Sequence, residues 1–226
     1  MENKNNRNTS IFDNPTGKSQ LYLLVGKSER GKSHFAKFLL YDRFLHAGWK
    51  FGISFIATKY TDAYNFLPKK TIYQGYHDKV LKAWTDGLQR ELKRKGKLPP
   101  SFVYFDDLVG VLTSNSKFFK NFITTFRHLN INVIISVQYL VAVSTTVRAQ
   151  VNYCLMYNEK RYQTLDILYE NFGGLFPTKD EFIEYLWKNT GGDKYVGILF
   201  VERIDNLKDN YIPIKAPARL PSGRLF

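Results

Sequence analysis

An apolar run that enters a glycine-bounded turn constrains this chain more than any other feature. Gln20–Val25 has the character of a buried strand and leads directly into the turn Gly26–Ser33. Apolar residues then recur at helical spacing from Phe35 to Leu45. The turn matches G-x-x-x-x-G-K-[ST] in full, and a strand before it with a helix after it is the context in which such a turn binds phosphate. The candidate phosphate-binding residues are Gly26, Lys27, Ser28, Glu29, Arg30, Gly31, Lys32 and Ser33.

Each key position of this turn has a physical role. Gly26 and Gly31 let the backbone turn sharply and bring its N–H groups close to phosphate oxygens. The following helix adds free N–H donors and a partial positive charge at its N-terminus. Lys32 places a positive charge at the β- and γ-phosphates, and the Ser33 hydroxyl is a ligand for Mg²⁺. The predicted cofactors are therefore ATP and Mg²⁺.

A second acidic site follows further along the chain. Phe102–Phe105 is an apolar strand that ends in Asp106 and Asp107, the Walker B pattern. Ligands of open parallel sheets bind beyond the carboxyl ends of the strands, which is where these carboxylates fall. We expect Asp106 to hold Mg²⁺ together with Ser33, and Asp107 to act as the general base for the attacking water. The alternative is an Asp-Asp turn without chemistry.

Three polar residues complete the catalytic candidates. Gln138 follows the buried strand Asn132–Val137, where its amide can bond the γ-phosphate or the attacking water. Arg127 and Arg148 each precede a strand, and an arginine can offset charge on a transferring phosphoryl group, in its own chain or in a neighbour. Each arginine alone can equally be a surface cation.

The pattern of strands and helices predicts the fold class. Strands are expected at 20–25, 51–57, 71–73, 102–105, 132–137, 151–157, 195–201 and 211–214, and helices at 34–46, 77–95, 116–129, 161–172 and 179–189. Apolar strands that alternate with helices indicate an α/β fold, with a mainly parallel sheet covered on both faces. We expect a flexible arm at 1–19, a P-loop ATPase core at 20–202 and a basic tail at 203–226.

Composition narrows the function classes. The 226 residues include 33 Lys and Arg against 20 Asp and Glu, a net charge of +13. A chain this basic usually meets a polyanion, although the excess can also serve solubility. One cysteine and four histidines argue against a disulfide framework and a zinc cluster. The N-terminus lacks a signal-peptide core and Val133–Val143 is too short to span a bilayer, so secretion and membrane insertion are not expected.

The ordered set of motifs resembles a known family. Gly26–Ser33, Phe102–Asp107, Phe126–His128, Val133–Gln138 and Val147–Asn152 are together similar to the viral DNA-packaging ATPases of the FtsK–HerA superfamily, the type found in poxviruses, giant viruses and virophages. The resemblance covers roughly residues 20–200. It implies a RecA/FtsK-like P-loop fold in which an additional strand lies between the P-loop strand and the Asp106 strand.

The same resemblance implies a translocase that hydrolyses ATP in a ring and threads double-stranded DNA into a capsid. The implied partners are DNA, further copies of the chain in a pentamer or hexamer, and capsid or portal vertex proteins. It implies that Gln138 is the polar sensor and that Arg127 is an arginine finger offered to a neighbour, with Arg148 as the second candidate. The implied location is the cytoplasm or virus factory of an infected cell, or the virion.

Other readings stay open on the residues alone. A small-molecule kinase would carry an arginine-rich lid over the phosphates and a less basic composition. A DNA-bound ATPase helper of replication would carry a helical lid after the core. The basic run Arg90–Lys97 is either a DNA contact or a solvated helix end. The C-terminal cations that are also candidate DNA or capsid contacts are Arg203, Lys208, Lys215, Arg219 and Arg224.

Overall fold

The computed structural model describes residues 12, 18–57, 62–108, 116–202 and 210–226. Within these residues eight strands form one sheet in the order β3-β2-β4-β5-β1-β6-β7-β8. The strands are β1 Leu21–Val25, β2 Phe51–Ile56, β3 Ile72–Gln74, β4 Ser101–Asp106, β5 Ile131–Val137, β6 Tyr153–Tyr157, β7 Gly197–Val201 and β8 Tyr211–Ile214. β1 to β6 are parallel, and β7 and β8 continue the sheet in antiparallel pairing.

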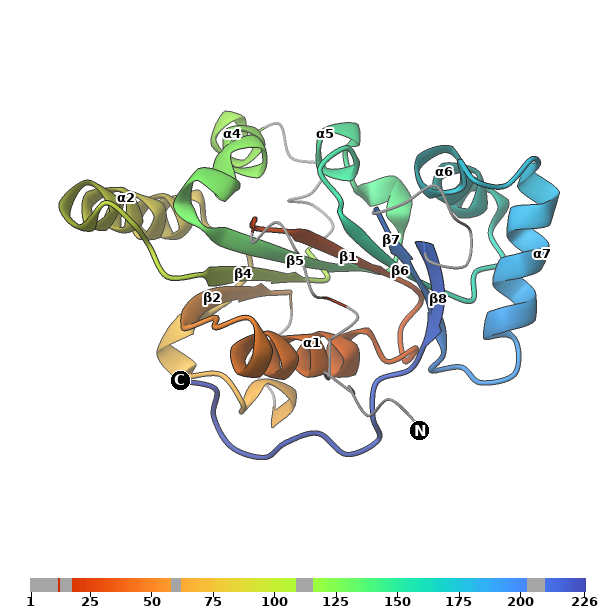
Figure 1. Cartoon of the computed structure of the whole chain (residues 1–226), viewed down its shortest axis with the longest axis horizontal. Helices are drawn as coiled ribbons and strands as arrows, with labels where there is room; N and C mark the ends of the chain where they lie inside the picture. Colours follow the sequence, from red (N-terminus) through yellow and green to blue (C-terminus); the bar gives the residue numbers. More distant parts are fainter. Residues whose placement is uncertain (1–11, 13–17, 58–61, 109–115, 203–209) are drawn as a thin grey trace, which may run out of the picture.

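Helices cover both faces of this sheet (Figure 1). The α-helices are α1 Lys32–His46, α2 Asp78–Lys95, α4 Lys117–Thr125, α5 Thr145–Arg148, α6 Tyr162–Phe172 and α7 Lys179–Thr190. Short 3₁₀ turns lie at Asp62–Tyr64, Lys69–Thr71, Phe126–Leu129 and Leu140–Ala142. The predicted α/β fold with a mainly parallel sheet is confirmed. No helix in the described part of the chain is long and apolar enough to cross a membrane.

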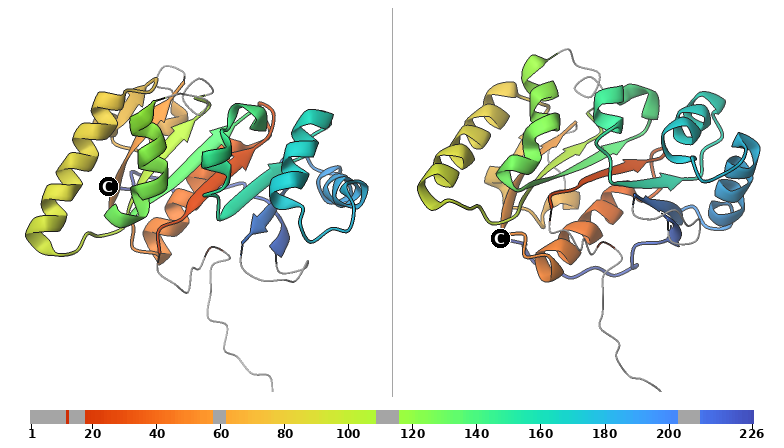
Figure 2. Two further views of the ribbon diagram at one scale, coloured as in Figure 1. Left: turned by 90° about the horizontal axis from the view of Figure 1, so that it is seen from above. Right: turned by 45° about the horizontal axis from the view of Figure 1, so that its top comes forward.

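Two apolar cores form because strand side chains alternate between the faces. Along β1, Leu21, Leu23 and Val25 join the core under α2, α4, α5, α6 and α7, whereas Tyr22 and Leu24 join the core under α1. The two further views in Figure 2 show α1 on one side of the sheet and the green and cyan helices on the other. β1 is buried along its whole length, which explains its continuous apolar sequence.

The strand order decides where the polar strand ends meet. β5 pairs with β1 on one side and with β4 on the other, so it lies between the P-loop strand and the Asp106 strand. This is the additional-strand arrangement that the resemblance implies. Because β1, β4, β5 and β6 are parallel, the segments that follow them emerge at one edge of the sheet. That edge holds the candidate site.

Two terminal segments pack more closely than the sequence suggests. Phe12, which falls in the expected loose arm, is buried and packs edge-on against Tyr22, Phe35 and Tyr153. An exposed phenylalanine would forfeit the free energy of burying its ring, which accounts for this docking. The strand predicted at 211–214, within the expected C-terminal tail, is confirmed as β8 of the same sheet, while Arg203 and Lys208 lie outside the described residues.

The predicted helix 116–129 differs in its second half. α4 ends at Thr125, and Phe126–Leu129 continues as a 3₁₀ turn that closes on Asn130 with a positive φ of 51°. A tighter turn and a left-handed residue reverse the chain within a few residues, so that β5 can begin at Ile131. Arg127 therefore lies in the reversal at the amino-terminal edge of the sheet.

Candidate active site

The loop Gly26–Gly31 joins β1 to α1, as the motif predicts. Gly31 caps α1 with a φ of 92°, a left-handed conformation that a residue with a Cβ adopts at a cost. No side chain caps this helix end, and its first turn carries no acidic residue. The free N–H groups and the partial positive charge of the helix are therefore available to an anion.

The two glycines have a second reason to lack side chains. A Cβ added at Gly26 would lie 2.8 Å from the Cβ of Tyr157, closer than real contacts allow, and one added at Gly31 would lie 3.2 Å from the Tyr195 ring. The loop is thus packed against two aromatic residues, Tyr157 at the end of β6 and Tyr195 just before β7. Glycine here serves both close approach to phosphate and close packing of the loop.

Lys32 lies at the start of α1 and is folded back on the loop. Its Nζ donates hydrogen bonds to the carbonyl oxygens of Gly26 and Lys27 at 2.7 and 2.9 Å. Burial lowers the pKa of Lys32, while the nearby charges of Asp107 and Asp106 raise it. An ammonium group held by two neutral carbonyls can move to phosphate oxygens, which are stronger acceptors.

Asp106 is the last residue of β4 and is almost fully buried. Its Oδ2 accepts hydrogen bonds from the Ser33 hydroxyl at 3.3 Å and from the Tyr64 hydroxyl. Burial raises the pKa of this carboxyl, and the hydrogen bonds from Tyr64 and Ser33 lower it in part. A hydroxyl and a carboxylate placed together beside a phosphate-binding loop fit Mg²⁺, which prefers oxygen ligands and usually shares them with phosphates.

Asp107 follows Asp106 and has an unusual backbone. Its φ is 56°, a left-handed conformation in a residue other than glycine, and its N–H donates to the Ser136 carbonyl oxygen of β5. Its Oδ2 accepts from Nε2 of Gln138, which directly follows β5. Its Oδ1 is buried and has no hydrogen-bond partner among the described residues. A strained backbone together with a buried carboxylate oxygen that has no hydrogen-bond partner is typical of a functional site.

A single cavity of about 350 Å³ unites these groups. Gly31, Lys32 and Ser33 line it from the loop and α1, Asp106 and Asp107 from the end of β4, and Gln138 from the end of β5. The sequence motifs therefore converge in space. The other loop residues differ: Ser28 and Glu29 also line the cavity, while Lys27 is exposed and Arg30 half-buried.

Arg127 and Arg148 do not join this cavity within one chain. Arg127 precedes β5 and Arg148 precedes β6, so both lie at the amino-terminal edge of the sheet, opposite the edge that holds Asp106. Arg127 donates to Gln150 and to the Asn152 Oδ1, and burial lowers its pKa. Arg148 lies at the end of α5, and its Nε is buried without a hydrogen-bond partner in the described part of the chain. A role of either arginine toward a neighbouring copy stays a prediction.

Two site residues escaped sequence analysis. Tyr64, which hydrogen-bonds Asp106, comes from a short 3₁₀ turn that no sequence pattern marks. Arg161 follows the end of β6, donates to the Gln138 carbonyl oxygen at 3.2 Å, and pairs with buried Glu159 at 2.6 Å. The hydrogen bonds that Arg161 donates to the Glu159 carboxylate raise the pKa of Arg161. The strand-end rule that located Asp106 and Gln138 could also have located Arg161.

Comparisons with known proteins bear on the fold. No protein-family model and no curated protein matches the sequence. The DNA-packaging ATPase B204 of Sulfolobus turreted icosahedral virus matches the fold with a TM-score of 0.60 and 15% identity, over 82% of this chain and 93% of B204. B204 of Sulfolobus turreted icosahedral virus 2, solved with ATP-γS, gives 0.61 and 15%, over 87% and 97%.

A third match is a bacterial protein. ATPases 2 and 3 of EssC from Geobacillus thermodenitrificans give a TM-score of 0.58 and 13% identity, over 91% of this chain and 41% of EssC. At such identities these matches show the fold. The fold expected from the order of the motifs, which is that of viral DNA-packaging ATPases such as B204, is confirmed.

Proposed function

We propose that this chain is an ATPase that couples hydrolysis to the movement of double-stranded DNA, as a motor of viral genome packaging. One observation carries the ATPase part: the loop lysine and serine, the paired aspartates and the strand-end glutamine line one cavity. The position of β5 between β1 and β4 supports a motor type of P-loop protein. The packaging duty rests on the fold shared with B204, whose own description is a DNA-packaging ATPase.

Each polar residue of the cavity has a separate role in the proposed hydrolysis of ATP. Lys32 exchanges its two carbonyl partners for phosphate oxygens, and the N-terminus of α1 donates N–H groups to the same anion. Ser33 and Asp106 would hold Mg²⁺, whose charge would offset that of the phosphate oxygens. Asp107 accepts a proton from water through its free Oδ1, and Gln138 holds the other oxygen of that carboxylate in place.

Assembly as a ring of five or six copies belongs to the same proposal, as do contacts with a capsid or portal vertex. Arg127 is the first candidate for a finger toward a neighbouring copy and Arg148 the second. Support for DNA as the partner comes from charge, because a net +13 supplies phosphate contacts that do not depend on sequence.

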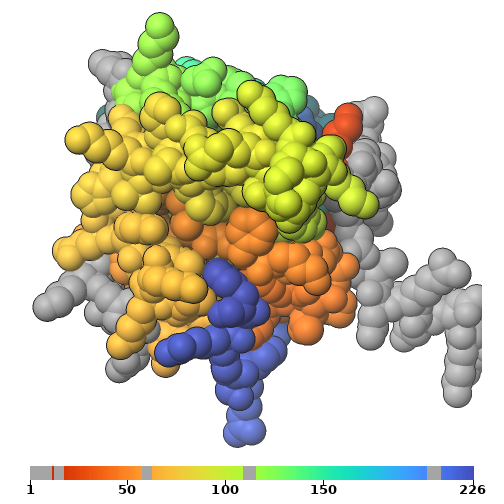
Figure 3. All heavy atoms as spheres, turned by 90° about the vertical axis from the view of Figure 1, so that its left-hand side faces the viewer, coloured from red at the N-terminus to blue at the C-terminus, as the bar shows by residue number. Residues whose placement is uncertain are grey.

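α2 offers a concentrated basic surface, with Lys93, Arg94 and Lys95 in its last turn. Its C-terminal half extends beyond the edge of the sheet, and its side chains project from the face shown in Figure 3. Glu91 pairs with Arg94 and Lys95. Arg90, Lys93 and Lys97 are exposed and have no acidic partner among the described residues. These three cations are the ones we expect to meet the DNA backbone.

Steady-state ATP turnover, measured with and without duplex DNA, tests the proposed function. The motor predicts multiple turnovers that duplex DNA accelerates, together with a native mass of several chains when nucleotide and DNA are present. Turnover that requires a small phosphate acceptor and ignores DNA would favour a kinase instead. A strict monomer that hydrolyses ATP only slowly on DNA would favour a replication helper.

Salt dependence tests the α2 surface. The triple change Arg90→Gln, Lys93→Gln and Lys97→Gln should reduce the slope of log affinity against log salt by about 3, since each phosphate contact contributes roughly 0.9. The control triple Lys117→Gln, Lys160→Gln and Lys188→Gln removes the same charge from exposed positions on other elements. Equal slopes for the two triples would show that net charge acts and that α2 is not the contact.

A further inference from the structure

A second cavity adjoins the phosphate-binding one. It measures about 450 Å³, within the range of small-molecule sites, and Gly31 and His34 line both cavities. Its remaining lining comes from Tyr157 at the end of β6, Tyr195 before β7, and Lys215, Ala216 and Ala218 after β8. Most of its walls therefore come from outside the phosphate-binding motif.

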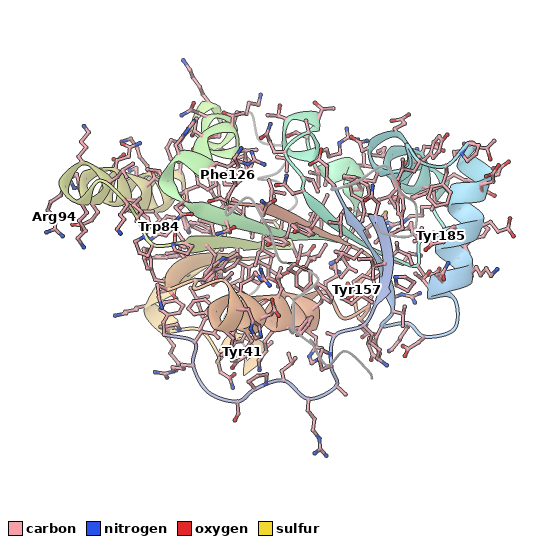
Figure 4. The ribbon with its side chains drawn as sticks, viewed as in Figure 1. Tyr41, Trp84, Arg94, Phe126, Tyr157 and Tyr185 are labelled. Carbon is pink, nitrogen blue, oxygen red and sulfur yellow. The ribbon has the colours of Figure 1, made fainter. Side chains whose placement is uncertain are left out.

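Tyr157 brings a buried polar group to this cavity. The residue is 2% exposed and lies on the face of the sheet that α1 covers (Figure 4). A Cβ added at Gly31 would lie 3.7 Å from its hydroxyl oxygen, so the hydroxyl is beside the loop. No residue that the structure describes hydrogen-bonds this hydroxyl. Tyr157 lines the cavity, so this hydroxyl is available to donate a hydrogen bond to a ligand there or to accept one.

Tyr195 brings an aromatic surface to the same cavity. Its side chain is 42% exposed, although its ring edge lies against Gly31. The backbone N–H of Tyr195 donates a hydrogen bond to the Asp193 Oδ1 at 2.8 Å, which holds the backbone of Tyr195 in place. The ammonium groups of Lys194 and Lys215 lie 4.9 and 5.9 Å from the ring centroid. Lys215 is ion-paired with Asp193 at 2.6 Å, which leaves Lys194 as the cation beside the ring. An exposed ring with a cation beside it suits a flat aromatic group attached to phosphate.

The C-terminal segment closes the cavity and is tied to α1. Nε2 of His34, in the first turn of α1, hydrogen-bonds the Pro217 carbonyl oxygen at 2.7 Å, and Ala216 is buried. Further along, the Tyr41 hydroxyl donates to the Gly223 carbonyl oxygen at 2.6 Å. Figure 3 shows this blue segment lying against the orange surface of α1. The wall is therefore held to the same helix that begins at the phosphate loop.

We propose that this cavity binds the nucleoside of the nucleotide whose phosphates lie on Gly26–Ser33. The base stacks on the Tyr195 ring, and the Tyr157 hydroxyl hydrogen-bonds the nucleoside. This inference rests on the proposed function for the position of the phosphates. It adds that selection of the base depends on the segments around β6, β7 and β8, because the loop itself contacts only phosphate.

Binding of ATP and of inorganic tripolyphosphate, measured by calorimetry on the full chain, separates the two sites. Tyr195→Ala should weaken ATP binding about 5- to 100-fold, the range for loss of a base–aromatic stack, and leave tripolyphosphate binding unchanged. Tyr157→Phe should weaken ATP binding several-fold and should also leave tripolyphosphate binding unchanged. Lys32→Ala should weaken both ligands.

Tyr162→Ala is the matched control, because Tyr162 is 69% exposed on α6 and lines neither cavity. It should bind both ligands as the unchanged chain does. If Tyr195→Ala and Tyr157→Phe keep their ATP affinity within twofold while Lys32→Ala loses it, the nucleoside site is wrong and the phosphate site stands. If the unchanged chain does not bind tripolyphosphate, the phosphate assignment fails and this inference fails with it.

Discussion

Both edges of the sheet carry polar side chains but use them differently. At the amino-terminal edge, the Asn152 Oδ1 accepts from both Arg127 and the Leu21 N–H. Asn132 accepts from the Gln20 N–H and donates to the Ser101 carbonyl oxygen. These groups hydrogen-bond one another and the ends of the strands. Apart from the Arg148 Nε, which has no hydrogen-bond partner among the described residues, these polar groups satisfy one another and fix where the strands begin.

At the carboxyl edge the polar groups are left incomplete. Asp107 keeps a buried oxygen without a partner among the described residues, and Lys32 has only neutral loop carbonyls as acceptors. Asp106 accepts hydrogen bonds from the hydroxyl groups of Ser33 and Tyr64, and the oxygen of a hydroxyl group can equally bind a cation. Polarity alone therefore does not mark a site in this molecule. What distinguishes the carboxyl edge is that its incompletely bonded groups, Lys32 and Asp107, line one cavity, whereas Arg148 at the other edge does not line it.

Removal of the free carboxylate should have the largest effect. Asp107→Asn takes away the proton acceptor but keeps an oxygen for the Gln138 amide, so ATP binding should persist and turnover should fall about 10²- to 10⁴-fold. Single-turnover and steady-state hydrolysis measure this. Asp86→Asn, a half-buried position on α2, is the control. Turnover near that of the unchanged chain would remove the proposed role of Asp107.

Loss of the loop lysine should come next. Among the described residues, Lys32 is the one lysine that lines the phosphate cavity. In Lys32→Ala, ATP affinity should fall roughly 100-fold, in line with loss of strong charged hydrogen bonds. Lys50→Ala, an exposed lysine at the other edge, should bind ATP normally. Unaltered ATP affinity in Lys32→Ala would mean that the two edges do not differ as described.

At the amino-terminal edge the expected effect is on stability. Arg127→Ala removes three hydrogen bonds of a half-buried cation and should lower the free energy of unfolding by about 2–4 kcal/mol. Denaturant unfolding measures this. A fall below about 0.5 kcal/mol would show that the network at this edge is not structural.

Gln150→Ala separates that structural role from a role toward a neighbour, because it breaks the same network and leaves the arginine. If Arg127 acts on the next copy in a ring, mixtures of Arg127→Ala with unchanged chains should lose more activity than their proportion predicts. Mixtures with Gln150→Ala should lose activity only in proportion. Proportional loss for both variants would leave Arg127 with a structural role alone.

The smallest effect should follow loss of a single hydroxyl at the site. Tyr64→Phe removes one donor to Asp106, and affinity for Mn²⁺ as a Mg²⁺ substitute, read by electron paramagnetic resonance with nucleotide present, should change about 3- to 10-fold. Tyr41→Phe loses a comparable hydroxyl contact, to Gly223, outside both edges. Equal Mn²⁺ affinity in both variants would show that Tyr64 does not position Asp106.

Local spacing determined much of this protein. The turn Gly26–Ser33 needs only its own residues and the strand and helix that flank it, and continuous apolar runs locate the buried strands because both faces of the sheet are covered. The pair Asp106–Asp107 was found because it directly follows such a run. These signals lie within a few residues of the groups that they predict, so a single sequence was enough.

Only the tertiary structure decided what meets across the chain. β5 lies between β1 and β4, so Gln138 reaches Asp107 across 31 positions of sequence, and Tyr64 reaches Asp106 across 42. Tyr157 and the residues after β8 lie beside the phosphate-binding loop because β6, β7 and β8 follow β1 on the side of the sheet opposite β5. The 3₁₀ reversal carried Arg127 to the opposite edge. Such contacts depend on strand order and chain reversal, which result from packing of the whole sheet and leave no local pattern.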